Sequence, residues 1–134
     1  LKKRCQALPT HSRDRIQIIP PTEEIASFYA AADLFVLSSK VESFPRVVLE
    51  AMVFGLPIIT TPVFGVREQV VERENALFYP PGGSRLLAEQ IQCLVCDDAR
   101  RLQMAERSRQ RVGQMTTFEE MVDAYAGICK EAVS

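Results

Sequence analysis

The stretch ADLFVLSSKVESFPRVVLEAMVFGLPIITT, residues 32–61, decides the fold class of this sequence. Its two apolar runs, 34–37 and 58–61, have the length and composition of strands buried on both faces of a parallel sheet. Between them, the pattern predicts a helix that begins at Ser43 or Phe44 and is ended by a Gly-Leu-Pro sequence. A strand, a helix and a strand in this order predict two parallel strands joined by a crossover helix.

The alternation of strands and helices continues on both sides of this stretch. Upstream, we expect a short strand over 15–19 and then a helix capped by Thr22, with an apolar face of Ile25, Phe28, Tyr29 and Ala32. The elements expected downstream are a short helix over 66–71, a brief strand over 77–79 and three helices capped by Ser84, Asp97 and Thr117. The whole pattern predicts an α/β, Rossmann-like parallel sheet with flanking helices. Because no repeat or linker interrupts it, we expect residues 1–134 to form a single domain.

Composition and charge exclude several classes of function. The chain carries 16 Lys and Arg against 17 Asp and Glu, a formal net charge of −1, which removes the electrostatic case for binding nucleic acid. No apolar run approaches the roughly 20 residues of a membrane-spanning helix, and no signal peptide opens the chain, so we expect a cytoplasmic protein. The 4 cysteines are interpreted as reduced thiols, and we expect no metal site. Since the sequence begins with Leu1 and not with Met, we expect a fragment of a longer protein.

Two loops of the predicted sheet are candidates for ligand binding. In a parallel sheet, ligands bind beyond the carboxyl ends of the strands, which places loops 38–46 and 62–67 on the functional edge. On a helical wheel, the helix after the first loop is apolar almost all round, with only Arg46 and Glu50 on a narrow polar stripe. Two interpretations of this stripe stay open. It is either an exposed ion pair or a carboxylate at the lip of a cleft, able to accept hydrogen bonds from a vicinal diol such as that of ribose.

The same residues carry a resemblance to a known family. Three segments resemble the signature block of the retaining glycosyltransferases of the GT-B fold, the group 1 family: 32–39, 42–52 and 55–60. The hallmark of this block is a Glu-x7-Glu spacing, which Glu42 and Glu50 have here. Residues 75–82 resemble a later segment of the same family. The resemblance implies that the chain is part of the C-terminal half of a GT-B fold, a nucleotide-sugar-binding domain from a larger enzyme.

The resemblance also implies roles for particular residues. Glu50 would hold the ribose hydroxyls of a nucleoside-diphosphate sugar, and Glu42 would lie beside the transferred sugar as the catalytic residue. The donor-binding residues that it implies are Ser43, Phe44, Pro45, Arg46, Val47 and Glu50 around the helix start, with Ile19 and Pro20 against the base. No metal or other cofactor is expected.

By this resemblance, the full-length protein would transfer a hexosyl unit from a nucleoside-diphosphate sugar to an acceptor, with retention of configuration. The acceptor would be bound by an N-terminal domain, and the protein would work in the cytoplasm or at the cytoplasmic face of a membrane. The isolated chain would be inactive. Two alternatives stay open. A non-catalytic nucleotide-binding or interaction domain is supported by Ser43, Phe64 and Ala76, where the family often has glycine. A sugar-nucleotide epimerase of the same fold would need a proton-abstracting pair that the pattern does not indicate.

Overall fold

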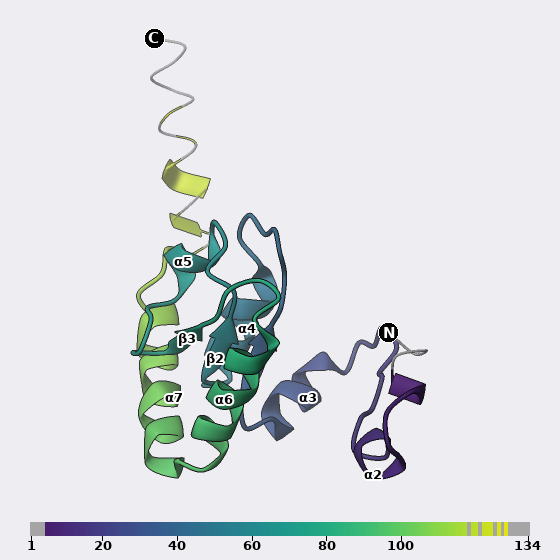
Figure 1. The fold of residues 1–134 in the computed structure, drawn as a ribbon. Helices are drawn as coiled ribbons and strands as arrows, with labels where there is room; N and C mark the ends of the chain where they lie inside the picture. The colour runs from purple at the N-terminus through teal and green to yellow at the C-terminus, as the bar shows by residue number, and fades with distance from the viewer. Residues whose placement is uncertain (1–4, 118, 121, 125, 127, 129–134) are drawn as a thin grey trace.

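The chain folds around a small parallel sheet, as the alternating pattern predicts. A computed structural model describes residues 5–117, 119–120, 122–124, 126 and 128. The described strands are β1 (Phe35–Leu37), β2 (Ile58–Thr60) and β3 (Ala76–Phe78), and they lie in the order β1-β2-β3 with all pairs parallel. The α/β fold class is therefore confirmed, and β1 and β2 begin and end within one residue of the predicted runs (Figure 1).

Helices cover both faces of this sheet. The described helices are α2 (Thr10–Arg13), α3 (Ile25–Ala31), α4 (Arg46–Val53), α5 (Val66–Gln69), α6 (Ser84–Val95) and α7 (Asp98–Val112). Neighbouring residues of β2 point to opposite faces, so Ile58 joins a core cluster with α4 while Ile59 joins a second cluster with α6. Because α7 packs against both α4 and α6, it links the two layers (Figure 1).

The first apolar run, 34–37, is less buried than predicted. Phe35, Val36 and Leu37 are half-buried, whereas all three residues of β2 are fully buried. The difference follows from position, because β1 forms an edge of the described sheet and β2 lies between two strands. An apolar run therefore indicated a strand correctly, but it did not show which strand would be central.

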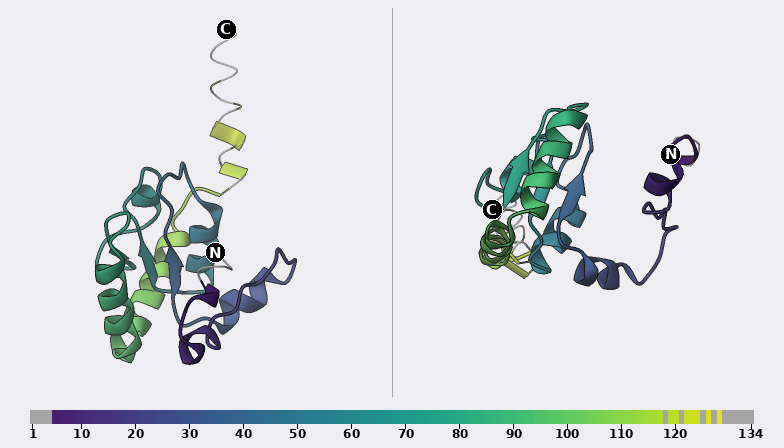
Figure 2. Two further views of the ribbon diagram at one scale, coloured as in Figure 1. Left: turned by 45° about the vertical axis from the view of Figure 1, so that its right-hand side comes forward. Right: turned by 60° about the horizontal axis from the view of Figure 1, so that its bottom comes forward.

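The predicted strand over 15–19 does not form. These residues are exposed and belong to no strand of the described chain. They are part of an arm that leads away from the sheet before α3, as the right-hand view in Figure 2 shows. A strand needs a neighbour to satisfy its backbone N–H and C=O groups, and this segment has none beside it in the described structure. Its β-branched residues were compatible with a strand but could not supply that neighbour.

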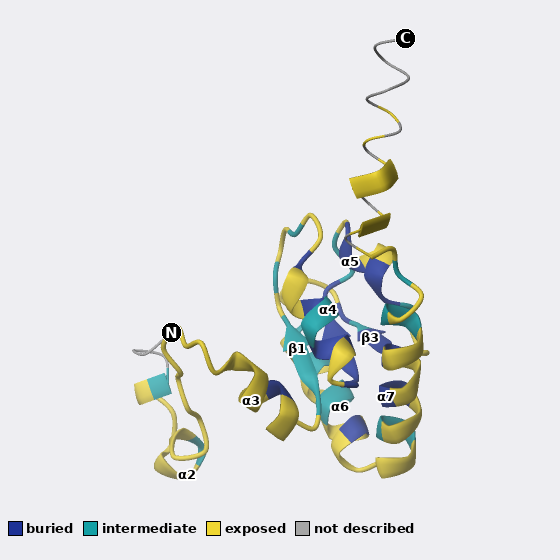
Figure 3. Cartoon of the chain, turned by 180° about the vertical axis from the view of Figure 1, so that it is seen from behind, coloured by how far each residue is buried: buried dark blue, intermediate teal, exposed yellow. Residues whose placement is uncertain are grey.

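The helix before β1 begins later than predicted and buries less of its apolar face. The Thr22 hydroxyl accepts a hydrogen bond from the Glu24 N–H at 3.1 Å, which closes a local turn, and α3 begins at Ile25. Of the predicted apolar face, Tyr29 is buried at 7% exposure, while Ile25 and Phe28 remain 47% and 43% exposed. Figure 3 shows α3 as a mostly exposed helix with one buried position.

Two of the four predicted helix caps, those of Asp97 and Thr117, are confirmed, and those of Thr22 and Ser84 are not. The Asp97 side chain accepts a hydrogen bond from the Arg100 N–H at 2.9 Å and caps α7. Thr117 and Glu120 form the expected reciprocal capping box, and the helix predicted to follow it lies partly outside the described residues. Ser84 is not a cap, because α6 begins at Ser84 itself and Gly83 precedes it without a side-chain hydrogen bond.

These caps give a matched pair of substitutions. We expect Asp97→Ala to lower the free energy of unfolding by about 1 kcal/mol, because the Arg100 N–H loses its acceptor. Ser84→Ala is the control, and it should leave stability unchanged or slightly raised, since alanine favours the helix interior. Chemical denaturation followed by circular dichroism measures both. Equal losses in the two variants would contradict the assignment of Asp97 as the cap.

Candidate functional site

The loops after β1 and β2 lie together at the carboxyl edge of the sheet, as predicted. The Thr61 hydroxyl, just after β2, donates a hydrogen bond to the backbone carbonyl of Ser39 in the loop after β1. Further along, Gly65 lies so close to Ser43 that a Cβ on Gly65 would be 1.5 Å from the Ser43 carbonyl oxygen. The two loops therefore form one unit, and Gly65 is glycine because no side chain fits there.

The start of α4 is held by a buried side chain from α5. Pro45 is buried and is the N-cap of α4, with a backbone ψ of 117°, so the helix begins at Arg46 and not at Ser43 or Phe44. The Pro45 carbonyl accepts hydrogen bonds from the Val48 N–H and from Nε2 of Gln69, each at 3.1 Å. Gln69 is fully buried, and sequence reasoning missed it. The available signal was a glutamine beside apolar residues on a short helix.

Glu42 lies in the loop before α4, within the loop 38–46 that the pattern of strands and helices predicted. Its carboxylate is half-buried, and Oε1 accepts a hydrogen bond from the Ser39 hydroxyl at 2.7 Å. Ser39 is itself tied to the next loop through its backbone carbonyl. The carboxylate of Glu42 is therefore oriented by residues from the loops after β1 and β2, at the edge where ligands of parallel sheets bind.

Glu50 does not form the exposed ion pair that was one of the two interpretations of the polar stripe. Its Oε2 accepts a hydrogen bond from the Tyr29 hydroxyl at 3.0 Å. Among the residues that the structure describes, no ion pair joins Glu50 to Arg46. Burial, the hydrogen bond to Glu50 and the charge of Glu50 raise the pKa of Tyr29 to about 12. The hydroxyl therefore remains a neutral donor at physiological pH.

The helical wheel shows α4 as apolar almost all round, but the rest of the protein does not surround this helix. Val48, Ala51 and Met52 are buried, but Val47 and Val53 are 38% and 60% exposed. The packed side of α4 faces the sheet, α5 and α7, and the opposite side is open. Glu50 is half-buried at the boundary between the two sides.

The remaining predicted donor-binding residues fall into two groups. Ser43, Phe44, Arg46 and Val47 are exposed around the start of α4, next to Glu42 in the chain. Ile19 and Pro20 are exposed on the arm before α3, where they line a shallow hollow together with Ile25 and Phe28. The structure thus brings the first group to the carboxyl edge, and it places the second group on the segment that stands apart from the sheet in Figure 2.

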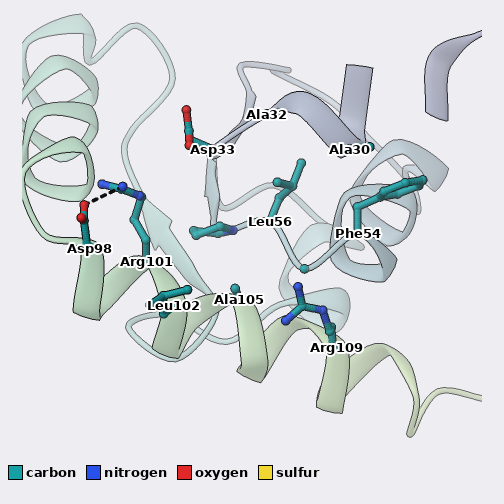
Figure 4. Close-up of a pocket in the computed structure, with 12 residues that line it drawn as sticks. Ala30, Ala32, Asp33, Phe54, Leu56, Asp98, Arg101, Leu102, Ala105 and Arg109 are labelled. Carbon is teal, nitrogen blue, oxygen red and sulfur yellow. Dashed lines mark ion pairs between the residues drawn. The ribbon is translucent and has the colours of Figure 1, made fainter. Parts of the chain in front are cut away.

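A polar pocket of about 400 Å³ lies at the opposite edge of the sheet, near the residues that precede β1 and β2 (Figure 4). Asp33, Gly55 and residues of α7 line it. Arg101 in this pocket pairs with Asp98 at 2.6 Å and donates to the carbonyls of Leu94 and Val95 at the end of α6. Its charge therefore stabilises the connection between α6 and α7.

Neither a metal site nor a membrane span is found in the described part of the chain. No group of three or more His, Cys, Asp or Glu side chains there is placed to hold a metal ion. None of the helices described is both long and apolar enough to cross a bilayer.

The sheet order, the flanking helices and the joined loops at the carboxyl edge define a Rossmann-like domain of the GT-B class. The sucrose-phosphate synthase of Thermosynechococcus elongatus superimposes with a TM-score of 0.85 at 28% identity, over 99% of this chain and 35% of that chain. The Anabaena protein HepE, solved in complex with UDP-glucose, superimposes with a TM-score of 0.81 at 25% identity, over 88% of this chain and 33% of that one.

Sequence comparison identifies the family within this class. The family described as glycosyl transferases group 1 matches residues 1–111, and the chain belongs to this family. The N-acetyl-alpha-D-glucosaminyl L-malate synthase of Bacillus anthracis is 32% identical over 118 residues, which are 88% of this chain and 31% of that protein. The chain thus spans about a third of the length of the proteins it matches.

Proposed function

We propose that this chain is the donor-binding domain of a retaining glycosyltransferase, which transfers a hexosyl unit from a nucleoside-diphosphate sugar to an acceptor held by another part of the full-length protein. The observation that carries the proposal is the placement of Glu42 and Glu50. Glu42 lies in the loop after β1, and Glu50 lies on α4, the helix that follows this loop. The loop after β2 contacts the loop after β1 at Ser39 and Ser43. Membership of the group 1 family supports this assignment.

In this proposal, the residues around the start of α4 contact different parts of the donor. The first N–H groups of a helix have no partner within the helix, so those of Phe44, Arg46 and Val47 are available to the diphosphate and to sugar hydroxyls, while Pro45 has no N–H to offer. Glu42 faces the transferred sugar, and Glu50 accepts hydrogen bonds from the ribose diol. The positive end of the α4 dipole opposes the charge of the leaving diphosphate, and the proposal includes no metal ion.

A uridine nucleotide is the first donor to test. HepE, whose structure contains UDP-glucose, is 25% identical to this chain over 88% of this chain. This similarity supports a UDP-sugar as the starting candidate. Isothermal titration of the full-length protein with UDP, GDP and ADP ranks the bases, and a coupled assay measures release of the diphosphate from the matching sugar nucleotide. Tight nucleotide binding without sugar transfer or donor hydrolysis would favour a non-catalytic domain instead.

Glu50→Gln should weaken binding of the preferred nucleoside diphosphate by about tenfold, because the amide replaces a charged acceptor of the ribose diol with a neutral group. The free energy of unfolding should change by less than about 1 kcal/mol, since the amide oxygen can still accept from Tyr29. Titration calorimetry and thermal melting measure these two effects.

Glu89→Gln is the matched control for this substitution. Glu89 is an exposed glutamate on α6 that pairs with Arg85 at 3.5 Å. The Glu89→Gln variant should bind the nucleoside diphosphate with the affinity of the wild type. Unchanged affinity in Glu50→Gln would remove Glu50 from the donor site.

A further inference from the structure

We propose that Tyr29 is the positioning residue for Glu50, and that its hydroxyl sets how well the domain distinguishes a ribonucleotide from a 2′-deoxyribonucleotide. This inference rests on the proposed function, in which Glu50 binds the ribose diol. It adds a residue from a different helix, outside the Glu-x7-Glu segment. The contact that carries it is the 3.0 Å hydrogen bond from the Tyr29 hydroxyl to Oε2 of Glu50.

The tyrosine ring is fixed in place by aromatic neighbours. Tyr29 is 7% exposed, the one buried residue of α3. Its ring centroid lies 5.5 Å from that of Phe54, in a stacked arrangement, and 6.0 Å from that of Phe35, in a tilted one. Since Phe54 follows α4 and Phe35 begins β1, the ring is packed against the same elements that position Glu50. The hydroxyl is thus a donor at a fixed point.

A fixed donor matters because glutamate is a flexible side chain. An unrestrained carboxylate at the rim of α4 would sample several rotamers, and the entropy of ordering it would reduce ligand affinity. With Oε2 held by Tyr29, the plane of the carboxylate is set before any ligand binds. Oε1 accepts no hydrogen bond from the described residues, and Oε2 retains a second lone pair. Both carboxylate oxygens can therefore still accept, one for each of the two hydroxyls of a ribose.

The surroundings of this hydrogen bond are largely apolar. Glu50 lines a hollow of about 210 Å³ whose other walls are Ile25, Ala26, Tyr29, Val53 and Phe54. Apart from Tyr29 and Glu50, these side chains are apolar. An apolar setting strengthens a hydrogen bond to a charged group. Because the Tyr29 hydroxyl stays protonated well above physiological pH, it donates under all ordinary assay conditions.

The test compares the affinity of UDP with that of 2′-deoxy-UDP for the full-length protein, or uses the corresponding pair for GDP or ADP if that base binds more tightly. The substitution is Tyr29→Phe, which removes the hydroxyl and keeps the ring that packs on Phe35 and Phe54. We expect the affinity for the ribonucleotide to fall about three- to tenfold, which is the effect of losing one typical hydrogen bond. The affinity for the 2′-deoxy compound should change much less, so the ratio between the two should move toward one.

Tyr79→Phe is the matched control. Tyr79 is also buried, at 4% exposure, but its hydroxyl lies near Ser38 and makes no hydrogen bond to Glu50 in the part of the chain that the structure describes. This variant should keep the wild-type ratio of affinities. A merely structural role for Tyr29 would lower the melting temperature and both affinities together, with an unchanged ratio, and that result would overturn the inference.

The variant Glu50→Gln separates the two hypotheses. If Glu50→Gln removes the discrimination between ribo- and 2′-deoxyribonucleotide while Tyr29→Phe retains it, the inference about Tyr29 is wrong and the donor site stands. If the wild type and Glu50→Gln show the same ratio, the assignment of Glu50 to the ribose fails, and the inference fails with it. Loss of discrimination in both single variants, with no further loss in the double variant, is the expected result.

Discussion

Gly65→Ala is expected to lower the free energy of unfolding by about 3 kcal/mol, the largest stability effect that we predict for a single methyl group in this chain. A Cβ at this position would lie 1.5 Å from the carbonyl oxygen and 2.6 Å from the carbonyl carbon of Ser43. These are backbone atoms, so no rotation of a side chain relieves the overlap. The preceding Phe64 has a φ of 20°, in a region that side chains rarely adopt, and this leaves the loop little freedom to adjust.

The same substitution should also impair donor binding. Moving Ser43 displaces the residues that lead into α4, and with them the N–H groups proposed to meet the diphosphate. Gly113→Ala is the control, because Gly113 has a φ of −67° and a Cβ there would come no nearer than 3.3 Å to another atom. Urea denaturation of the two variants measures the difference. Equal stability would show that the loops after β1 and β2 are not in the contact described.

Glu42→Ala should lower turnover by about 100-fold or more while changing the dissociation constant of the free nucleoside diphosphate by less than about threefold. The reason is its position. The carboxylate of Glu42 is oriented by Ser39 in the loop before α4, whereas the proposed nucleotide contacts come from the helix itself. A residue that faces the transferred sugar stabilises the charge that develops during transfer, so its loss lowers turnover. A free nucleoside diphosphate lacks the sugar, so its affinity does not depend on this residue.

Steady-state kinetics of the full-length enzyme and calorimetry with the nucleoside diphosphate measure the two quantities separately. Glu89→Ala provides a matched exposed glutamate, which should leave both unchanged. Parallel losses in turnover and nucleotide affinity for Glu42→Ala would place this carboxylate in the nucleotide site and not beside the sugar.

Local features of the amino-acid sequence were enough to predict most of the elements. Some signals act within a few residues: the apolar runs of β1 and β2 and the Gly-Leu-Pro sequence that ends α4. Such elements can be predicted without knowing which other part of the chain packs against them. The Asp97 cap and the Thr117 capping box are likewise hydrogen bonds across three residues. The order of strand, helix and strand then implied parallel strands, because the crossover leaves no other direction.

The errors came from features whose outcome depends on a distant partner. Residues 15–19 have the composition of a strand, but a strand forms only beside another strand. Ile25 and Phe28 have helical spacing, but their burial depends on what packs against α3, and in the described structure they remain exposed. A periodic pattern shows that a face is apolar, and it does not show what covers that face.

The sequence by itself therefore determined the fold class, the order of the elements and the edge of the sheet at which Glu42 and Glu50 lie. Only the tertiary structure decided which polar groups meet there. Gln69 reaches Pro45 across 24 residues, and Tyr29 reaches Glu50 across 21. The physical reason is that periodicity and capping are local properties of the chain, whereas a hydrogen bond between elements depends on how the whole core packs and on how closely Gly65 lets two loops approach.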